Sequence, residues 1–360
     1  MTHHVEANEA VAPIAHLAAE LNYQKRLPLI YTAMGTYRDW VEEDYSEGLR
    51  YLSEALKISE DLKDTLSSWY ASWFLGMNLS MNCEFEKGVE FFEKSLDLGT
   101  SASRLIPMAM AKIGIVSFNY AWHGKNDLAC QISKEALQMA QESGDIYIKG
   151  IACSGHGLAC HCKGLLDESE NTLLQALSLC EKAGQLGWWT WASGGLGHVY
   201  ADMGEYQKAE AYYEKGISTL ERTRIYPFWA NMWKVSLARS KVLNKDQDIT
   251  LGEIFKYYEN MNLKVQKGWA ARHVAEILLN MDDQHLSEAE DWVKKAIEVD
   301  KRNDTMWSLG GDYALYARLL KRKGDPPKAK ENLAKAIDIL KECGADGWVK
   351  RYKEEMASLC

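Results

Sequence analysis

One stretch of the sequence decides the fold: Leu196-Gly197, followed by Tyr200, Gly204, Ala209 and Tyr213. An adjacent Leu and Gly, an aromatic residue, a glycine, and then Ala and an aromatic four positions apart describe two helices joined by a turn. Gly197 lets the two helices approach closely, Gly204 ends the first helix, and Ala209 gives the second helix room to cross the first. The stretch therefore predicts a pair of packed helices.

The same pattern recurs along the chain with a period of about 40 residues. Small residues occupy the helix-crossing position with spacings of 40, 41, 40, 40, 80 and 40, at Gly48, Gly88, Ala129, Ser169, Ala209, Ala289 and Ala329. Tryptophans recur every 38 to 41 residues near the start of each first helix, at Trp188, Trp229, Trp269, Trp307 and Trp348. Two independent markers with one period predict a repeat array rather than a chance match.

The repeat resembles the tetratricopeptide repeat (TPR) family, whose usual period is about 34 residues. The resemblance implies an all-α fold, a right-handed α-solenoid of about eight TPR-like helix pairs. We expect the solenoid to span residues 23–343, with a degenerate unit at about 226–262 where the spacing of 80 falls. Residues 1–22 and 344–360 are each expected to form a capping helix, because solenoids need polar ends for solubility.

Two shorter segments suggest a narrower resemblance. Residues 21–27 (LNYQKRL) and 342–349 (ECGADGWV) look like the C-terminal TPR region of large bacterial signalling proteins, in which an ATPase module accompanies an adenylate or guanylate cyclase or a kinase. The resemblance implies a sensory or scaffolding region. The sequence lacks a phosphate-binding loop, since His123-Gly124-Lys125-Asn126 has neither the upstream Gly nor the hydroxyl residue. No cyclase or kinase activity is therefore carried over.

Composition excludes several functional classes. A net charge of −9 disfavours nucleic acid as the main partner. No apolar run is long enough to span a bilayer, and the N-terminus lacks the basic and apolar regions of a signal peptide. We therefore expect a cytoplasmic protein without membrane contact, in which the 8 cysteines are reduced thiols.

The densest ligand-like cluster lies between Cys153 and Cys162. Cys153, His156 and Cys160 are at i, i+3 and i+7, on one helix face, so a soft metal such as zinc could use them. In the repeat register, however, they correspond to the packing positions Ser193, Leu196 and Tyr200. We expect them to pack, and we expect no metal, no cofactor and no catalytic residue in this chain.

The expected binding surface is the concave face, which the first helices of the pairs line in TPR arrays. Counting from the turn glycines assigns these residues to it: Tyr37, Trp40, Tyr70, Trp73, Met77, Phe118, Trp122, Trp191, His198, Asp202, Arg318, Lys321 and Arg322. The N-terminal half of this face is aromatic and its far end is basic. Aromatic residues and Arg are enriched at binding hot spots, so we expect an exposed apolar contact site with a basic end for an acidic group.

We predict a non-catalytic scaffold or sensory module that binds a protein or peptide in bacterial signal transduction; self-association is left open. Two alternatives remain. One is a small-molecule sensor, in which the superhelix closes around a metabolite and regulates a partner; it would show an enclosed pocket rather than a continuous groove. The other is a metal-dependent enzyme centred on the Cys153–Cys162 cluster, which metal analysis would detect.

Overall fold

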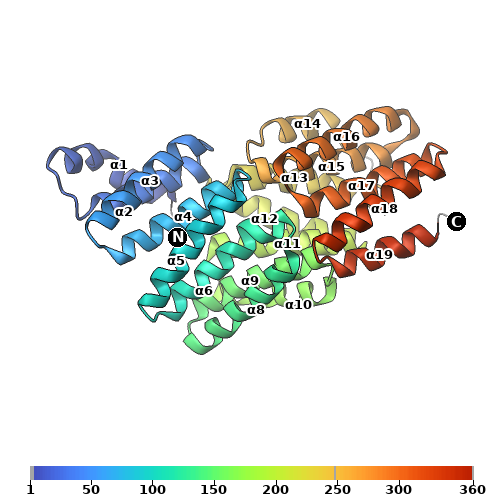
Figure 1. Ribbon diagram of the computed structural model, residues 1–360. Coiled ribbons are helices and arrows are strands. Elements are labelled where there is room, and N and C mark those ends of the chain that lie inside the picture. The colour runs from blue at the N-terminus through green and yellow to red at the C-terminus, as the bar shows by residue number, and fades with distance from the viewer. Residues whose placement is uncertain (1–3, 247–248, 359–360) are drawn as a thin grey trace.

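The computed structural model describes residues 4–246 and 249–358, and the regular elements in those residues are all helices. Residues 1–3, 247–248 and 359–360 lie outside the described residues, and with them the ends of both predicted capping segments and two residues of the predicted degenerate unit. The helical pairs stack side by side from the blue N-terminal end to the red C-terminal end (Figure 1).

Eight successive helix pairs confirm the predicted α-solenoid. They are α2 (Leu27–Trp40) with α3 (Tyr45–Asp61), α4 (Thr65–Met81) with α5 (Phe85–Ser101), α6–η1–α7 (Leu105–Gly114, Ile115–Tyr120, Ala121–His123) with α8 (Asn126–Ser143), α9 (Ile146–Lys163) with α10 (Leu166–Lys182), α11 (Leu186–Met203) with α12 (Tyr206–Thr223), α13 (Pro227–Leu243) with α14 (Leu251–Glu259), α15 (Lys264–Met281) with α16 (Leu286–Asn303), and α17 (Met306–Arg322) with α18 (Pro326–Glu342). Helix α1 (His4–Glu20) precedes the pairs, α19 (Asp346–Ala357) follows them, and the short η2 (Asp283–His285) leads into α16.

Small residues allow close packing where the two helices of a pair cross, as two of the pairs show. A Cβ atom on Gly197 would lie 2.5 Å from a ring carbon of Tyr213, and one on Gly157 would lie 2.5 Å from Leu173 Cγ. Gly204 has a φ of +82°, a backbone conformation that side chains other than glycine rarely adopt. The roles expected for Gly197 and Gly204 are thus confirmed.

First and second helices differ in how much of their circumference is buried. In α5 the buried residues form one stripe with spacings of three and four: Phe85, Gly88, Phe92, Ser95 and Gly99. In α4 every residue from Ser67 to Met81 is buried except Tyr70. A helix that is buried on all sides lies inside the array. The first helices therefore form the inner layer, and the second helices present their polar face outward.

Segments far apart in sequence meet inside the superhelix. The Tyr226 amide donates to the Trp40 carbonyl at 3.0 Å, and the Asn126 amide donates to the Cys343 carbonyl at 3.0 Å. The Trp348 indole N–H donates to the carbonyl of His161 at 2.9 Å. These contacts join units that are several repeats apart, so the superhelix is wound tightly enough for its inner faces to touch.

The described part of the chain holds Cys83, Cys130, Cys153, Cys160, Cys162, Cys180 and Cys343 as unpaired thiols, as the sequence predicts. Among residues 4–246 and 249–358, no helix combines the length and the apolar content that crossing a membrane requires.

Candidate functional site

The aromatic residues predicted for the concave face lie on the inner helices, but they are buried. Trp73 and Phe118 are each 2% exposed and Trp122 is 4% exposed. Their rings pack on one another and across the superhelix: the Trp73 and Phe118 centroids are 5.9 Å apart, those of Phe118 and Trp191 5.5 Å, and those of Trp122 and Trp269 5.5 Å. Met77 is also buried, and Tyr37, Trp40 and Tyr70 are partly buried.

The expectation of an exposed apolar face is therefore wrong for Trp73, Phe118 and Trp122. The cause is the tight winding, which brings opposing rings together; Trp40, for example, lies 4.7 Å from Tyr226, centroid to centroid. Three cavities between these rings hold only about 20, 40 and 30 Å³, which is room for little more than a water molecule each. A ligand-binding role of the aromatic residues remains a prediction.

A larger cavity of about 230 Å³ lies in the C-terminal half. Most of its lining comes from the five helices α11, α13, α15, α17 and α19, and α12 and α18 add one residue each. Its polar lining comprises His198, Asp202, Arg239, Arg272, His273, Glu276, Arg318 and Arg351, and its aromatic lining includes Trp269, Trp307 and Trp348. Four arginines against two carboxylates give the lining an excess of positive charge. Three of the predicted residues, His198, Asp202 and Arg318, are brought together here.

Arg239 connects two carboxylates from neighbouring helices. Its Nε donates to Glu276 Oε2 at 2.5 Å, and its Nη2 lies 3.7 Å from Asp202 Oδ1. The side chains of Arg239 and Glu276 are 11% and 12% exposed. Burial by itself raises the pKa of Glu276, but the attraction of Arg239 outweighs it and the pKa is lowered. Glu276 is thus held ionised.

Asp202 is also held as an anion. Its Oδ2 lies 2.8 Å from His161 Nε2, and the Arg351 guanidinium donates to its main-chain carbonyl at 2.7 Å. Burial opposes ionisation, yet the hydrogen bond with His161 and the charge of Arg239 lower the pKa of Asp202. The two carboxylates of the cavity lining, Asp202 and Glu276, therefore already have partners within the chain.

Arg272 is positioned by a glycine on the facing helix. Its Nη1 donates to the Ser308 carbonyl at 2.6 Å and lies 3.3 Å from Asp312 Oδ1. A Cβ atom on Gly311 would lie 2.1 Å from Arg272 Nη1, so a side chain at this position would displace the guanidinium group. Burial raises the pKa of Asp312, so its carboxyl offers Arg272 little compensating charge.

The predicted basic end of the concave face divides into two parts. Arg318 lines the cavity and makes a two-point hydrogen bond to Glu355, with Nε–Oε1 and Nη2–Oε2 distances both of 2.8 Å. Lys321 and Arg322 are exposed and do not line the cavity. Arg322 instead pairs with Asp283, with Nη2 2.6 Å from Oδ1.

Sequence reasoning missed Arg239, Arg272 and Glu276. Arg239 lies on α13, in the degenerate unit, where the repeat pattern that sets the register is weakest. The separation of the ion-pair partners along the sequence could have revealed them. Arg239 and Glu276 are 37 residues apart, and Arg272 and Asp312 are 40 apart, which is close to one repeat. Opposite charges one period apart on first helices meet on the inner face.

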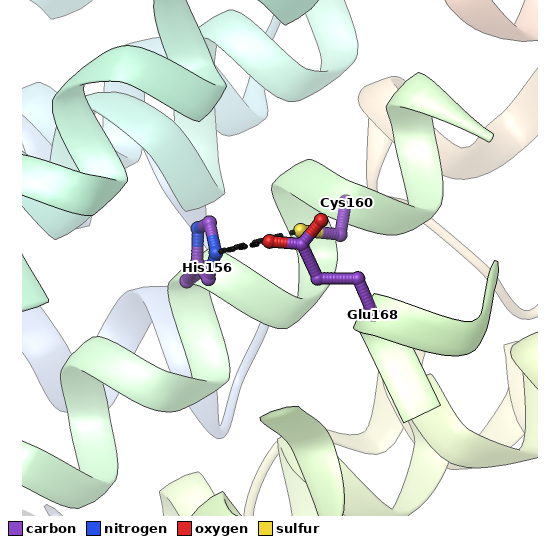
Figure 2. A group of neighbouring side chains, drawn as sticks. All are labelled: His156, Cys160 and Glu168. Carbon is purple, nitrogen blue, oxygen red and sulfur yellow. Dashed lines mark hydrogen bonds and ion pairs between the residues drawn. The ribbon is translucent and has the colours of Figure 1, made fainter. Parts of the chain in front are cut away.

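The predicted Cys153–Cys162 cluster is only partly assembled. His156 and Cys160 lie side by side on α9, but their third neighbour is Glu168 from the start of α10 rather than Cys153 (Figure 2). Cys153, His156 and Cys160 are all buried, as packing positions require.

The fold and the cavity together define an α-solenoid built from helical repeats, with a charged chamber inside one half. Residues 150–222 match the tetratricopeptide repeat family, which confirms the resemblance for that part of the chain. No curated protein sequence matches this chain.

Three solved structures illustrate the similarity in fold. A Rap protein complexed with competence and sporulation factor is 14% identical, with a TM-score of 0.53, over 99% of this chain and 95% of that one. The Rap conjugation gene regulator of plasmid pLS20, in complex with the Phr* peptide, is 16% identical with a TM-score of 0.56, over 79% and 77%. A signal transduction ATPase with numerous domains from Pyrococcus horikoshii, which has a tetratricopeptide repeat sensor, is 15% identical with a TM-score of 0.52, over 98% and 55%. At these identities the likeness concerns the fold.

Proposed function

We propose that this chain is a regulatory interaction module of a bacterial signalling system, and that it binds an acidic segment of a protein or peptide in the C-terminal cavity. The observation that carries the proposal is the lining itself, with four arginines against two carboxylates around about 230 Å³. Guanidinium groups bind carboxylates in a two-point geometry, and Arg318 already does so with Glu355.

The matching repeats and the neighbouring folds support this class of function. Both Rap structures are complexes, one with competence and sporulation factor and one with the Phr* peptide, and the ATPase has a tetratricopeptide repeat sensor. No residue in the proposal acts on a reacting atom, so the proposed role is binding rather than catalysis.

The test is calorimetric titration of the full chain with an array of short Asp- and Glu-rich peptides, each paired with the same peptide carrying Asn and Gln. We expect some acidic peptides to bind and their amide counterparts to bind at least tenfold more weakly. Arg351→Ala is the informative variant, because this exposed residue can be removed without opening the core. It should weaken binding by more than about 1 kcal/mol. Equal binding of acidic and amide peptides would refute the proposal.

The small-molecule alternative is favoured by one observation. The cavity is lined by Trp269, Trp307 and Trp348, and beyond the shared residues His198 and Trp269 the neighbouring cavity holds only about 40 Å³, so the space for a ligand is short. A small di- or tricarboxylate would fit such a chamber. Thermal denaturation with succinate, glutarate and citrate tests this: stabilisation by one of them in the wild type, and not in Arg272→Gln, would favour the sensor.

A further inference from the structure

Three metal-ligating side chains converge in the fourth repeat, away from the charged cavity. His156 and Cys160 are one turn apart on α9, and Glu168 stands in the first turn of α10, which follows immediately after the turn at Gly164. One ligand atom of each, an imidazole nitrogen, a thiol sulfur and a carboxylate oxygen, lies within 4.8 Å of the other two. Figure 2 shows the imidazole and the thiol pointing toward the same carboxylate.

The neighbours of His156 are compatible with a proton on its Nδ1. The hydroxyl of Ser133 donates to the Cys130 carbonyl at 2.9 Å, and the same oxygen lies 2.9 Å from His156 Nδ1. In the tautomer that carries its hydrogen on Nδ1, the imidazole donates to the Ser133 hydroxyl oxygen, which in turn donates to the Cys130 carbonyl. In this tautomer, which metal binding requires, Nε2 presents a lone pair to the cluster.

This lone pair faces two further electron-pair donors, the Glu168 carboxylate and, once it is deprotonated, the Cys160 sulfur. Glu168 Oε1 is 3.3 Å from Nε2, and Cys160 Sγ is 3.6 Å from it. A carboxylate, an imidazole lone pair and a thiolate around one point are the environment in which a divalent cation binds.

The two separations that involve Nε2 also fit a tetrahedral centre. With metal–sulfur and metal–nitrogen bonds of about 2.3 and 2.05 Å, tetrahedral angles place sulfur and nitrogen about 3.6 Å apart. The corresponding nitrogen–oxygen edge is about 3.4 Å. The observed Nε2–Sγ and Nε2–Oε1 distances are 3.6 and 3.3 Å.

We propose that His156 Nε2, Cys160 Sγ and the Glu168 carboxylate bind a divalent cation of the zinc class, with a water molecule in the fourth position. Glu168, whose side chain is 46% exposed, provides the opening to solvent. When the cation binds, the Cys160 S–H bond breaks, its proton leaves to solvent, and the sulfur–metal bond replaces it. Ser133 acts one shell further out by fixing the imidazole orientation.

The site differs from the one that the sequence pattern suggested. Cys153 is on the same helix but outside the cluster, and the carboxylate ligand comes from the next helix, beyond a glycine turn. A bound cation would fasten α9 to α10 within the region that matches the tetratricopeptide family. This proposal is independent of the ligand proposed for the C-terminal cavity.

The test uses the full chain, treated with a chelator and then titrated with Co²⁺, whose thiolate charge-transfer band reports a Co–S bond. We expect one Co²⁺ per chain, displacement by Zn²⁺, and a higher melting temperature with either metal. Cys160→Ser should abolish the band, and Glu168→Gln should weaken binding more than tenfold while leaving the fold intact. Ser133→Ala should weaken binding by about tenfold.

Cys153→Ser is the matched control, since it removes a buried thiol from the same helix without touching the cluster. It should keep both the band and the stoichiometry. The proposal is overturned if no band develops in the wild type, if Cys160→Ser retains it, or if Cys153→Ser loses it. Should Cys160→Ser fail to fold, an unchanged affinity in Glu168→Gln would overturn the proposal by itself.

Discussion

The two halves of the inner face are built from the same element, the first helix of each pair, yet they fill their interior differently. Over the N-terminal and central repeats, aromatic rings from opposite sides meet, as Phe118 and Trp191 do at 5.5 Å, and leave cavities of 20–40 Å³. In the C-terminal half, guanidinium groups and carboxylates face one another around about 230 Å³. A position on the inner face of the repeat array therefore does not by itself determine whether a cavity remains between the side chains there.

The chemistry of the side chains explains this difference. Aromatic rings gain free energy by contact and close the space between them. Charged groups lose hydration when they are brought together, and only well-placed partners offset that loss. Arg239 and Glu276 have such partners and Arg318 has Glu355, but the lining still holds four arginines and two carboxylates around a space of about 230 Å³, which leaves room for water or for an acidic ligand. We expect mutations in the first half to affect stability and mutations in the second to affect binding as well.

The strongest test of the comparison is Trp73→Ala in the aromatic half. Trp73 is 2% exposed and donates its indole N–H to the Met110 carbonyl at 3.1 Å. Its removal should lower the free energy of unfolding by about 4 kcal/mol, because a large cavity forms among rings that cannot collapse. Urea denaturation measures the change. Trp73→Phe, which keeps a ring, should lower the free energy of unfolding by less than half as much. An unchanged denaturation midpoint for Trp73→Ala would contradict the conclusion that Trp73 is buried.

Arg239→Met probes the charged half and should have the next largest effect. The change leaves Glu276 buried without its partner and should lower the free energy of unfolding by about 2–3 kcal/mol. The loss is smaller than for a fully enclosed ion pair because water can enter the cavity. The double variant Arg239→Met/Glu276→Leu is the control, and it should recover most of the stability. If the double variant is less stable than Arg239→Met alone, Glu276 does not depend on Arg239.

Much of the fold could be predicted from the sequence, because turn glycines and crossing residues are local requirements. Gly204 must adopt a positive φ and Gly197 must admit Tyr213, whatever the rest of the chain does. The eight pairs followed from counting such positions. The same reasoning could identify inner positions such as Trp73, His198 and Arg318.

How far the superhelix closes could not be predicted, because it depends on contacts between units several repeats apart. No local sequence pattern predicts the contacts of Tyr226 with Trp40 and of Trp348 with His161. These contacts close the superhelix, and the aromatic rings are therefore buried rather than exposed. The charged cavity was missed for a related reason. Arg239 belongs to the unit whose repeat pattern is weakest, and the role of Gly311 is visible only once Arg272 lies against it.

A third prediction concerns pH and the buried His273 of the charged half. Burial, together with Arg239, lowers the pKa of His273 well below its usual value, and its Nδ1 lies 3.1 Å from Ser236 Oγ. Above about pH 7.5 the residue is neutral in both the folded and the unfolded chain and has no effect. As pH falls through about 6.5, the unfolded chain gains a proton that the folded chain does not, so stability is lost.

The pH effect is isolated by comparing the wild type with His273→Gln, because other titrating groups cancel in the difference. Between pH 7.5 and 5.5 the wild type should lose about 1 kcal/mol relative to the variant, measured by urea denaturation at both values. His16→Gln is the matched control, since the His16 side chain is 83% exposed. If the difference in stability between the wild type and His273→Gln is the same at both pH values, this histidine titrates alike in the folded and the unfolded chain.

The smallest expected effect locates the boundary of the charged half. Arg322 lies one turn beyond Arg318 on α17, but its side chain is 38% exposed and pairs with Asp283 at the surface. Exposed ion pairs contribute little, so Arg322→Ala should change the free energy of unfolding by less than about 1 kcal/mol. Because Arg322 does not line the cavity, the variant should also bind any acidic peptide that the wild type binds with unchanged affinity, whereas Arg351→Ala should not. Equal losses of affinity in the two variants would show that acidic ligands follow the outer basic surface of α17, and that the cavity is not where they bind.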